Sequence, residues 1–588
     1  PAVLVTDANN NPVSGVAVNF AVASGGGSVA TGAAATTNAS GIATVDSWTM
    51  GTAHGANTMT ATSASLTGSP LTFTATGVAG AVTQWLVTSS SYSPVAGAAV
   101  TVSAQLADQY GNEVTASGVP VAWTKSPTSG SFAATTTTNA SGIATVVFTA
   151  GITANTSYAV TINGSGKTGS CASIVTTVGP AFRIALSVGN GQSATVNTAV
   201  TTDPAVLVTD ANNNPVSGVA VTFAVASGGG SVIGGSTTTN ASGIATVGSW
   251  TLGTVVGANT MTATNASLTG SPLTFTATGL VGAASKYVVT SSGYSPIAGA
   301  AVTVSAQLAD QYGNAVATNG ITVTWTKSPT TSGSFASGTT STNSSGVATV
   351  VFTTGTTVTT YAVTATSSSG GARTGTSPNI VSVAGAAKNL AVNAGAGQSA
   401  TVGTAVTTDP AVLVTDTNGN PVSGVTVTFA VASGGGSVIG GSATTNASGI
   451  AAVGSWTLGT THGTNTLTAT VAGLTGSPLT FTATGATGAA AKYVVASNDY
   501  SVKKGTTVTI TAQLTDQYGN EVTTSGTVVT WTKTGTGGSF ASNTTNTNSS
   551  GIATVVFTVS STDRVKHVVT ATSAGGVTGD SPEITTTR

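Results

Sequence analysis

The stretch from Val16 to Val22 reads Val-Ala-Val-Asn-Phe-Ala-Val, with larger apolar residues at every second position and small or polar residues between them. Side chains two apart on an extended chain point to the same face, so this pattern predicts a strand with one face in a core and the other in solvent. The same alternation occurs in residues 71–76 and 100–106. About seven such runs per hundred residues, separated by clusters of Gly, Asn, Asp and Pro, predict an all-β fold made of antiparallel sandwiches.

A short turn, Asn-Ala/Ser-Ser-Gly, divides the chain at nearly equal intervals. It begins at positions 38, 139, 240, 343, 446 and 548, which gives spacings of 101, 101, 103, 103 and 102 residues. Self-similarity at this period predicts a tandem array of six immunoglobulin-like domains. We expect them in six ranges, named A1, B1, A2, B2, A3 and B3 in chain order: 1–79, 80–179, 180–281, 282–384, 385–487 and 488–588.

The names reflect two alternating repeat types. Pro-Ala-Val-Leu-Val-Thr-Asp occurs only in the A repeats, whereas Asp-Gln-Tyr-Gly-Asn and Trp-Thr-Lys occur only in the B repeats. Aligning the types on the shared turn places Phe20 of A1 opposite Trp123 of B1, and Trp48 near Phe148. Each core is therefore predicted to hold two large aromatic residues on successive strands, in swapped order in the two types.

Repeat A1 differs from the other A repeats at its start. Residues 182–188 and 389–393 read as a first strand ahead of Pro204 and Pro410, and no equivalent stands ahead of Pro1. A sandwich without an edge strand exposes unpaired backbone and apolar core. We therefore expect A1 to lack its N-terminal strand and the sequence to be part of a longer chain. The alternative is a strand donated by a neighbouring subunit.

Charge is scarce in this chain, which has 14 Lys and Arg, 15 Asp and Glu, and a net charge of −1. Soluble proteins typically have about 25% charged residues, against 5% here. Without a positive field there is nothing to attract a phosphate backbone, so we expect no nucleic-acid partner. Outward positions carry Thr, Ser and Ala instead, so copies lying side by side would feel little repulsion.

The single cysteine, Cys171, excludes an intramolecular disulfide. Because the sister repeats have Ser377 and Ser581 at its position, we expect it to be a small buried residue. No run of 18 or more apolar residues occurs, so no membrane-spanning helix is predicted in this segment.

Several motifs resemble a known family. They are Gly-Asn-Gly-Gln-Ser-Ala-Thr-Val (189–196), Val-Thr-Asp-Ala-Asn-Asn-Asn-Pro-Val-Ser-Gly-Val (208–219), Ser-Gly-Gly-Gly-Ser-Val (227–232) and Ala-Ser-Gly-Ile-Ala-Thr-Val (241–247). They are similar to motifs of bacterial Ig-like (Big) domains of the invasin and intimin type. The resemblance covers all six repeats, most sharply the A type. It implies an extracellular or cell-surface role, as in adhesin stalks, surface fibrils and envelope-layer subunits. It also implies that the repeats have no catalytic residues and that binding specificity lies in a terminal domain outside this chain.

Three turns of the A repeats have the Asp-x-Asn-x-Asn spacing of calcium loops. A calcium loop of the EF type also needs a glycine at its sixth position and a glutamate at its twelfth, whereas the sixth position here is proline. Asp and Asn equally cap β-turns through their own side chains, and we favour such a turn over a calcium site. The candidate ligands are Asp7, Asn9, Asn11, Asp210, Asn212, Asn214, Asp416, Asn418 and Asn420. The equivalent B turns, which begin at Asp108, Asp310 and Asp516, receive the same interpretation.

No constellation of residues points to catalysis. Most acidic residues lie in turns, and no pair of carboxylates stands out for acid/base work. None of the three histidines, His54, His462 and His567, has a second histidine or a cysteine near it in the sequence, so the usual metal clusters are excluded. His54 and His462 are predicted loop residues. We expect no enzyme, no catalytic residue, no metal and no cofactor.

Two further motifs can be interpreted either as structural turns or loops or as functional sites. Ser-Gly-Gly-Gly-Ser lies between predicted strands and not ahead of a helix, so we predict a wide hairpin loop and no phosphate cradle. Asn38-Ala-Ser40 and its repeats match the N-glycosylation acceptor, but the same residues form a good turn, which we favour. The Thr-rich outer faces leave O-glycosylation open.

Short junctions between the predicted domains favour a semi-rigid array. Together with the uncharged surface, they favour a non-enzymatic extracellular structural protein, a subunit of a microbial surface filament, sheath or layer that packs against copies of itself. One alternative is the stalk of a monomeric bacterial adhesin that presents an absent tip domain. Another is a carbohydrate-binding module array of a secreted hydrolase, which would bind host or surface glycans through exposed aromatic residues. The candidates for such platforms are Tyr92, Tyr110, Tyr294, Tyr312, Tyr500 and Tyr518.

Overall fold

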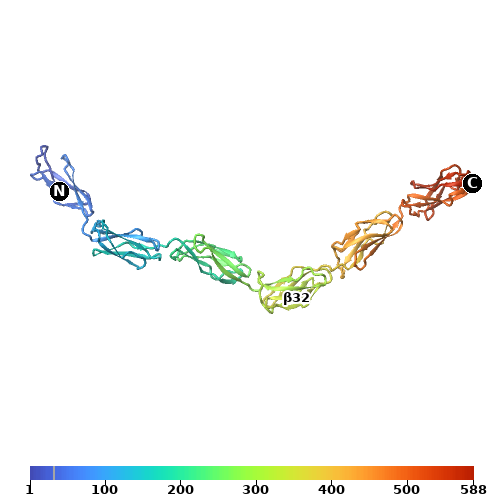
Figure 1. Cartoon of the computed structure of the whole chain (residues 1–588), viewed down its shortest axis with the longest axis horizontal. Coiled ribbons are helices and arrows are strands. Elements are labelled where there is room, and N and C mark those ends of the chain that lie inside the picture. Colours follow the sequence, from blue (N-terminus) through green and yellow to red (C-terminus); the bar gives the residue numbers. More distant parts are fainter. Residues whose placement is uncertain (31–32) are drawn as a thin grey trace. The chain divides into compact units, whose positions relative to one another are not determined.

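The computed structural model describes residues 1–30 and 33–588 and contains strands, turns and loops but no helix in those ranges (Figure 1). The predicted all-β fold is confirmed. It follows that no helix of the described residues could cross a membrane. The chain divides into two compact units, Pro1–Gly282 and Ala283–Arg588.

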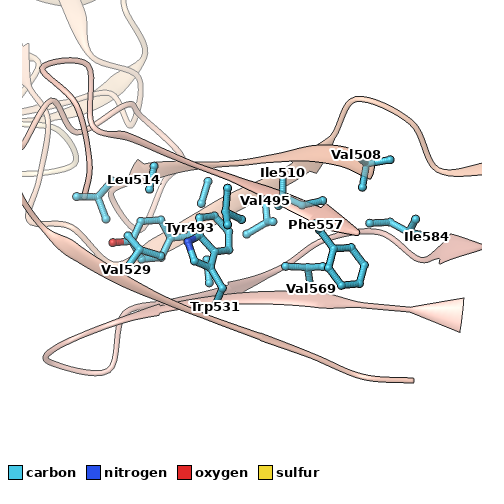
Figure 2. Packing of buried hydrophobic residues seen from close by; sticks show 14 of the residues in the cluster. Tyr493, Val495, Val508, Ile510, Leu514, Val529, Trp531, Phe557, Val569 and Ile584 are labelled. Atoms are coloured by element: carbon cyan, nitrogen blue, oxygen red, sulfur yellow. The ribbon is translucent and has the colours of Figure 1, made fainter. Parts of the chain in front are cut away.

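Buried apolar residues form six hydrophobic clusters in the described chain, and the buried members of each come from a single repeat. In B3, Tyr493 and Trp531 lie together at one end of the cluster, and Phe557 packs near Val569 and Ile584 at the other (Figure 2). A local core of this kind in each repeat is what the alternating pattern predicts. The domain boundaries given above remain predictions.

Repeat A2 shows the complete A-type sandwich. One sheet has the order β17-β19-β23 and the other β18-β26-β25-β20-β22, while β21 pairs with β24. The predicted first strands are confirmed as β17 and β36. The A2 strands are β17 (Arg183–Val188), β18 (Gln192–Thr195), β19 (Ala205–Thr209), β20 (Ala220–Ser227), β21 (Ser231–Ile233), β22 (Ser236–Thr238), β23 (Ile244–Thr246), β24 (Ser249–Thr251), β25 (Gly257–Thr264) and β26 (Leu273–Leu280). The A3 strands, in the same order, are β36 (Asn389–Ala394), β37 (Gln398–Thr401), β38 (Ala411–Thr415), β39 (Thr426–Ser433), β40 (Gly436–Ile439), β41 (Ser442–Thr444), β42 (Ile450–Ala452), β43 (Ser455–Leu458), β44 (Gly463–Thr470) and β45 (Leu479–Ala486).

Repeat A1 has the later strands of this plan but no equivalent of β17 or β18 among the described residues. Its first sheet is reduced to the pair β1-β5, beside the sheet β4-β2-β7-β8 and the pair β3-β6. Its strands are β1 (Ala2–Leu4), β2 (Ala17–Ser24), β3 (Gly27–Val29), β4 (Ala34–Thr36), β5 (Ile42–Thr44), β6 (Trp48–Met50), β7 (Gly55–Thr62) and β8 (Leu71–Gly77).

Repeat B1 packs a sheet β13-β10-β9 against a sheet β12-β11-β14-β15, whereas in B3 the equivalent strands of both sheets are joined into one eight-stranded sheet. The B1 strands are β9 (Gln84–Ser89), β10 (Ala99–Ala107), β11 (Pro120–Ser126), β12 (Thr135–Thr137), β13 (Ile143–Thr149), β14 (Ser157–Gly164), β15 (Lys167–Ser170) and β16 (Ile174–Val175). The B2 strands are β27 (Lys286–Ser291), β28 (Ala301–Ala309), β29 (Thr322–Ser328), β30 (Ser334–Phe335), β31 (Thr339–Ser341), β32 (Val347–Thr353), β33 (Thr360–Ser367), β34 (Arg373–Thr376) and β35 (Ile380–Val381). The B3 strands are β46 (Lys492–Ser497), β47 (Ser501–Lys503), β48 (Thr507–Thr515), β49 (Val528–Lys533), β50 (Ser539–Phe540), β51 (Thr544–Asn546), β52 (Ile552–Thr558), β53 (Lys566–His567), β54 (Val569–Ser573), β55 (Thr578–Asp580) and β56 (Ile584–Thr587).

The swapped aromatic pairs are found where the alignment predicts them. Phe223 on β20 and Trp250 on β24 are buried in A2, as are Trp123 on β11 and Phe148 on β13 in B1. The two types differ in how they hold the indole N–H. Trp123 Nε1 donates to Thr136 Oγ1 at 2.7 Å, whereas the buried Nε1 of Trp250 has no partner among the described residues.

The hairpin predicted for Ser-Gly-Gly-Gly-Ser is wrong. In A2 this segment joins β20 to β21, and these strands are not paired with each other, because β21 pairs with β24 and β20 with β22 and β25. Gly228, Gly229 and Gly230 have φ of +84°, +79° and +87°, which only glycine adopts readily. A Cβ on Gly230 would also overlap the carbonyl oxygen of Thr251. The glycines therefore let the chain cross from one sheet to a separate ribbon.

Candidate functional site: the joints between repeats

The candidate calcium residues of A2 lie in a tight turn whose aspartate is 2% exposed. Asp210 Oδ1 accepts hydrogen bonds from the backbone N–H groups of Asn212 at 2.9 Å and Asn214 at 2.8 Å. This is the geometry of the turn in which an Asp side chain bonds its own following backbone.

The last asparagine of this turn reaches beyond its own repeat to a loop of B1. Asn214 Nδ2 donates to the carbonyl oxygen of Ile152 at 2.8 Å, and Asn214 Oδ1 accepts from the N–H of Ala154 at 2.9 Å. Asn214 Nδ2 also donates to Asp210 Oδ2 at 2.9 Å, so both amide hydrogens are used. The asparagine thus holds two backbone groups of the preceding repeat, and Asp210 fixes the orientation of its amide.

The same aspartate also binds the linker. Gly179, in the segment that joins B1 to A2, donates its N–H to Asp210 Oδ2 at 2.9 Å. A second contact adds to the joint, because Asn212 Nδ2 donates to the carbonyl oxygen of Ala96 in B1 at 2.9 Å. One carboxylate therefore ties together its own turn, the linker and the asparagine that holds the neighbour.

The arrangement occurs at four joints of the described structure, two in each compact unit. In the first unit, Asn112 of B1 binds Thr52 O and the His54 N–H of A1, at 2.7 and 2.9 Å. In the second unit, Asn420 of A3 binds Thr356 O and the Val358 N–H of B2, at 2.8 and 2.9 Å. Asn520 of B3 binds Thr460 O and the His462 N–H of A3, at 2.7 and 2.9 Å. The linker glycines that donate to the aspartates of these joints are Gly80, Gly385 and Gly488.

The joint carboxylates are held in the ionised form. Burial disfavours the charge of Asp210, but the hydrogen bonds from the Asn214 side chain and from the backbone of Gly179, Asn214 and Asn212 outweigh it and lower its pKa. The same balance lowers the pKa of Asp416 and Asp516. For Asp108 the hydrogen bond from the Asn112 side chain is the largest cause of a lowered pKa. An ionised acceptor strengthens each of these hydrogen bonds.

A calcium ion would need oxygen lone pairs that these turns already use. Both oxygens of Asp210 accept N–H donors, and the hydrogens of those donors occupy the directions from which a cation would approach. Within residues 1–30 and 33–588, no three His, Cys, Asp or Glu side chains are grouped so that they could share a metal ion. The donor set fits a hydrogen-bonded joint better than a metal centre.

Two further Asp-Asn turns lie in A1 and B2. Asp7 of A1 is exposed, and its Oδ1 accepts from the N–H groups of Asn9 and Asn11 at 2.8 and 2.9 Å. Asp310 of B2 is buried, and its carboxylate accepts from the Tyr312 N–H and from Asn314. Both turns close through the same Asp-to-backbone hydrogen bonds.

The histidines occupy two kinds of position. His54 and His462 lie in loops, as predicted, and the joint uses only their backbone N–H groups. His567 lies fully buried on β53, where Nδ1 donates to Thr534 O at 2.9 Å and Nε2 accepts from the Ser560 N–H at 3.2 Å. Its ring meets Phe557 edge-on, with centroids 5.1 Å apart. B2 has Tyr361 at this place, with its hydroxyl accepting from the Gly355 N–H at 2.8 Å.

Cys171 is buried, as predicted, and burial raises the pKa of its thiol. Its equivalent Ser377 accepts a hydrogen bond from the Val363 N–H at 3.1 Å. The position is a packing site in a B-repeat core.

All six predicted surface tyrosines are exposed. Three of them fold over their own hairpins, since the hydroxyl groups of Tyr92, Tyr294 and Tyr500 accept the N–H groups of Ser89, Ser291 and Ser497. A ring held against its own backbone offers less free face for stacking a sugar. The Asn-x-Ser motifs form the predicted turns, in which Asn38 Oδ1 accepts from Ser40 and Ile42 at 2.9 and 3.1 Å.

Sequence reasoning identified the turns but missed their reach to the preceding repeat. The available signal was the asparagine four residues after each aspartate, which recurs in both types although the residues between differ. It stands at Asn11, Asn112, Asn214, Asn314, Asn420 and Asn520.

No protein-family model and no curated protein matches the chain. Solved structures do match, among them the Escherichia coli adhesin FdeC, with 17% identity, a TM-score of 0.32 and coverage of 52% of this chain and 99% of FdeC. InvD of Yersinia pseudotuberculosis matches with 18% identity, a TM-score of 0.31 and coverage of 51% of this chain and 98% of its own. The integrin-binding bacterial protein invasin matches with 14% identity and a TM-score of 0.26. The match covers 72% of this chain and 82% of the invasin chain. The matched structures thus include the proteins whose motifs the repeats resemble.

Proposed function

We propose that this chain is a non-enzymatic extracellular structural protein in which Asp-Asn joints hold consecutive repeats within each compact unit in fixed orientations. The observation that carries the proposal is that one asparagine forms hydrogen bonds with two backbone groups of the preceding repeat. These bonds occur in the same way at four joints. Neighbouring domains move relative to each other by default when their interface is small. A joint that is tied at the loop, the linker and the turn restricts that motion.

The surface of the B repeats favours a filament, sheath or layer in which copies of the chain pack laterally. In B1 the outward face of β9-β10-β13 carries Thr, Ser and Gln, with Leu86 and Val147 exposed among them. The equivalent exposed pairs are Val288 and Val351 in B2, and Val494 and Val556 in B3. Apolar side chains on a sheet face with few charges favour contact with a like surface.

The stalk of a monomeric adhesin is the second candidate, because stiff joints serve a spacer equally well. The third candidate, a glycan-binding module array, has less support because the tyrosines on the hairpins have their hydroxyl groups engaged.

Electron microscopy and light scattering of the purified chain over a range of concentrations separate the first two candidates. We expect regular assemblies that are lost in the variant Val147→Lys/Val351→Lys/Val556→Lys, because six charges on a pair of facing copies repel. The matched control places three lysines on the exposed threonines Thr74, Thr276 and Thr482 of the A repeats, and it should still assemble. Isolated particles of the unmodified chain at every concentration would favour the stalk.

A further inference from the structure

The turns of the two repeat types differ in the residue two positions after the aspartate. It is asparagine in every A repeat and tyrosine in every B repeat. The hydrogen bonds that hold the preceding loop do not need this difference, because turns of both types make them. The difference therefore points to another contact of the joint. The residues at this position are Asn9, Asn212 and Asn418 in the A repeats, and Tyr110, Tyr312 and Tyr518 in the B repeats.

A turn glycine of the preceding repeat lies beside the loop that the joint asparagine holds. This glycine is Gly97 in B1, Gly299 in B2 and Gly403 in A3, with φ of +85°, +90° and +71°. Its N–H donates to the carbonyl oxygen of a second glycine, one residue ahead of the bound loop carbonyl, at 3.0, 2.8 and 3.0 Å in the three repeats. Both repeat types therefore present a backbone surface without a Cβ next to the joint.

At the joints that lead from a B repeat to an A repeat, a side chain of the preceding loop covers this glycine. A Cβ built on Gly97 would lie 3.3 Å from Asn212 Nδ2 and 3.8 Å from Ile152 Cγ2. The short asparagine fits beside the isoleucine, and its amide donates to a carbonyl oxygen of B1 at 2.9 Å. In B2, Thr356 Cγ2 would lie 3.8 Å from a Cβ on Gly299. The preceding B repeat thus fills part of this space with its own loop.

At the joint from A3 to B3, the following repeat fills the space instead. Among the described residues, the three heavy atoms nearest to a Cβ on Gly403 would all belong to Tyr518. The closest is the hydroxyl oxygen, at 2.5 Å. Tyr518 is 44% exposed, so its hydroxyl end covers the glycine while much of the side chain remains in solvent. A tyrosine reaches across the joint where the shorter asparagine would not.

The two ways of covering the glycine exclude each other. A tyrosine in place of Asn212 would meet the Ile152 side chain over Gly97, and forcing extra atoms into a filled contact is destabilising. An asparagine in place of Tyr518 would leave Gly403 uncovered, and the area that the ring buries would be lost. A favourable contact with one partner and a clash with the other together give specificity.

We propose that the residue two positions after the joint aspartate determines which type of repeat can precede it. Tyrosine selects an A repeat and asparagine selects a B repeat, so the alternation of the array is encoded at its joints. This selection rests on the proposed function, because it acts only where a joint holds consecutive repeats. It gives Tyr518 a role in the joint in place of one in glycan binding.

The test exchanges the two residues in the full chain and follows the joint amides by native-state hydrogen exchange. Tyr518→Asn should speed exchange of the His462 amide about fivefold, because a partly buried ring loses its contact. Tyr500→Asn, the same change on a hairpin of B3 away from the joint, should leave that amide unchanged. Asn212→Tyr should speed exchange of the Ala154 amide to a similar degree. Each new residue already occurs in the turns of the other type, so the turns themselves should fold.

Compensating changes in the loops separate selection from general damage. Thr460→Ile gives the loop of A3 the side chain that B1 has at this place, so it should restore slow exchange of the His462 amide in Tyr518→Asn. Ile152→Ala removes the obstacle over the glycine of B1, and it should restore slow exchange in Asn212→Tyr. Both loop residues bind the joint asparagine through their backbone carbonyls, so these changes keep the shared hydrogen bonds.

Asn520→Ala distinguishes a failure of this selection from a failure of the joints. If Asn520→Ala speeds exchange of the His462 amide while the exchanged residues leave the joint amides unchanged, the joints stand and the selection is overturned. If Asn520→Ala has no effect either, the proposed function fails, and the selection fails with it. The selection is also overturned if the loop changes do not restore slow exchange.

Discussion

Replacing Asn214 by alanine should uncouple B1 from A2 without unfolding either repeat. The side chain is 8% exposed and makes two hydrogen bonds across the joint, to Ile152 O and from the Ala154 N–H. At about 1 kcal/mol net for each bond, the substitution should remove about 2 kcal/mol of coupling. Since about 1.4 kcal/mol corresponds to a factor of ten, the Ala154 amide should exchange about 30-fold faster in N214A.

Native-state hydrogen exchange measures this amide directly, and the chain offers a matched control. Asn11 occupies the same turn position in A1, where its amide bonds Asp7 within the turn at 3.1 Å. Asn11→Ala should therefore leave exchange at the other joints unchanged. Equal exchange of Ala154 in the unmodified chain and in N214A would refute the reasoning, and so would a general loss of protection throughout the B1 core.

Four further outcomes test the electrostatics and the cores. Because folding lowers the pKa of Asp210, the contribution of its carboxylate to the stability of the joint should persist down to about pH 4 and be lost as the pH falls further. The loss should appear as faster hydrogen exchange of the Gly179 amide, after correction for the pH dependence of intrinsic exchange rates. Chelators should leave the joint amides unchanged, since hydrogen bonds satisfy the aspartates. Trp531→Phe should destabilise its repeat by about 1–3 kcal/mol more than Trp456→Phe, as measured by hydrogen exchange at increasing denaturant concentration. The reason is that Trp531 Nε1 donates to a threonine hydroxyl at 2.9 Å, whereas Trp456 Nε1 is buried without a partner among the described residues. His567→Phe should cost about 2 kcal/mol through its two lost hydrogen bonds, and His567→Tyr should cost less because a tyrosine hydroxyl accepts the equivalent N–H in B2.

The sandwich cores could be predicted because strand alternation fixes which side chains face inward. A shift of one residue in the β2 strand would turn Val18 and Phe20 to solvent and Asn19 into the core, so only one register is consistent with the sequence. The swapped aromatics follow from the same rule applied to aligned repeats. The prediction was weaker where the order of strands matters, as in the crossing from β20 to β21, because pairing between distant strands leaves no trace in a local pattern.

The joints could be predicted only in part, for a related reason. Asp210 bonds backbone groups two and four residues away, so the Asx turn is visible in the sequence. Asn214 has the same hydrogen-bonding groups whether it faces solvent or a neighbouring loop. The two loop residues that it binds, Ala154 and Ile152, lie 60 and 62 residues earlier in the sequence. His567 was hard to place in a core for another reason, since histidine is only intermediate in its preference for the interior. Its alignment with Tyr361 was the signal that could have placed it.

The joint recognises backbone atoms, and this explains how two repeat types can share it. The residues that supply the carbonyl are Thr52, Ile152, Thr356 and Thr460, and those that supply the N–H are His54, Ala154, Val358 and His462. An isoleucine and a threonine present the same carbonyl, and a histidine, an alanine and a valine present the same N–H, so the loop sequence is free to vary as long as its path is kept. At all four joints the side-chain groups that make these bonds come from the Asp and Asn of the turn. Because an A turn binds a B loop and a B turn binds an A loop in this one way, either type of repeat can follow the other. The contacts shared by all four joints therefore depend on two residues of the turn, on one backbone N–H of the linker and on the conformation of one loop.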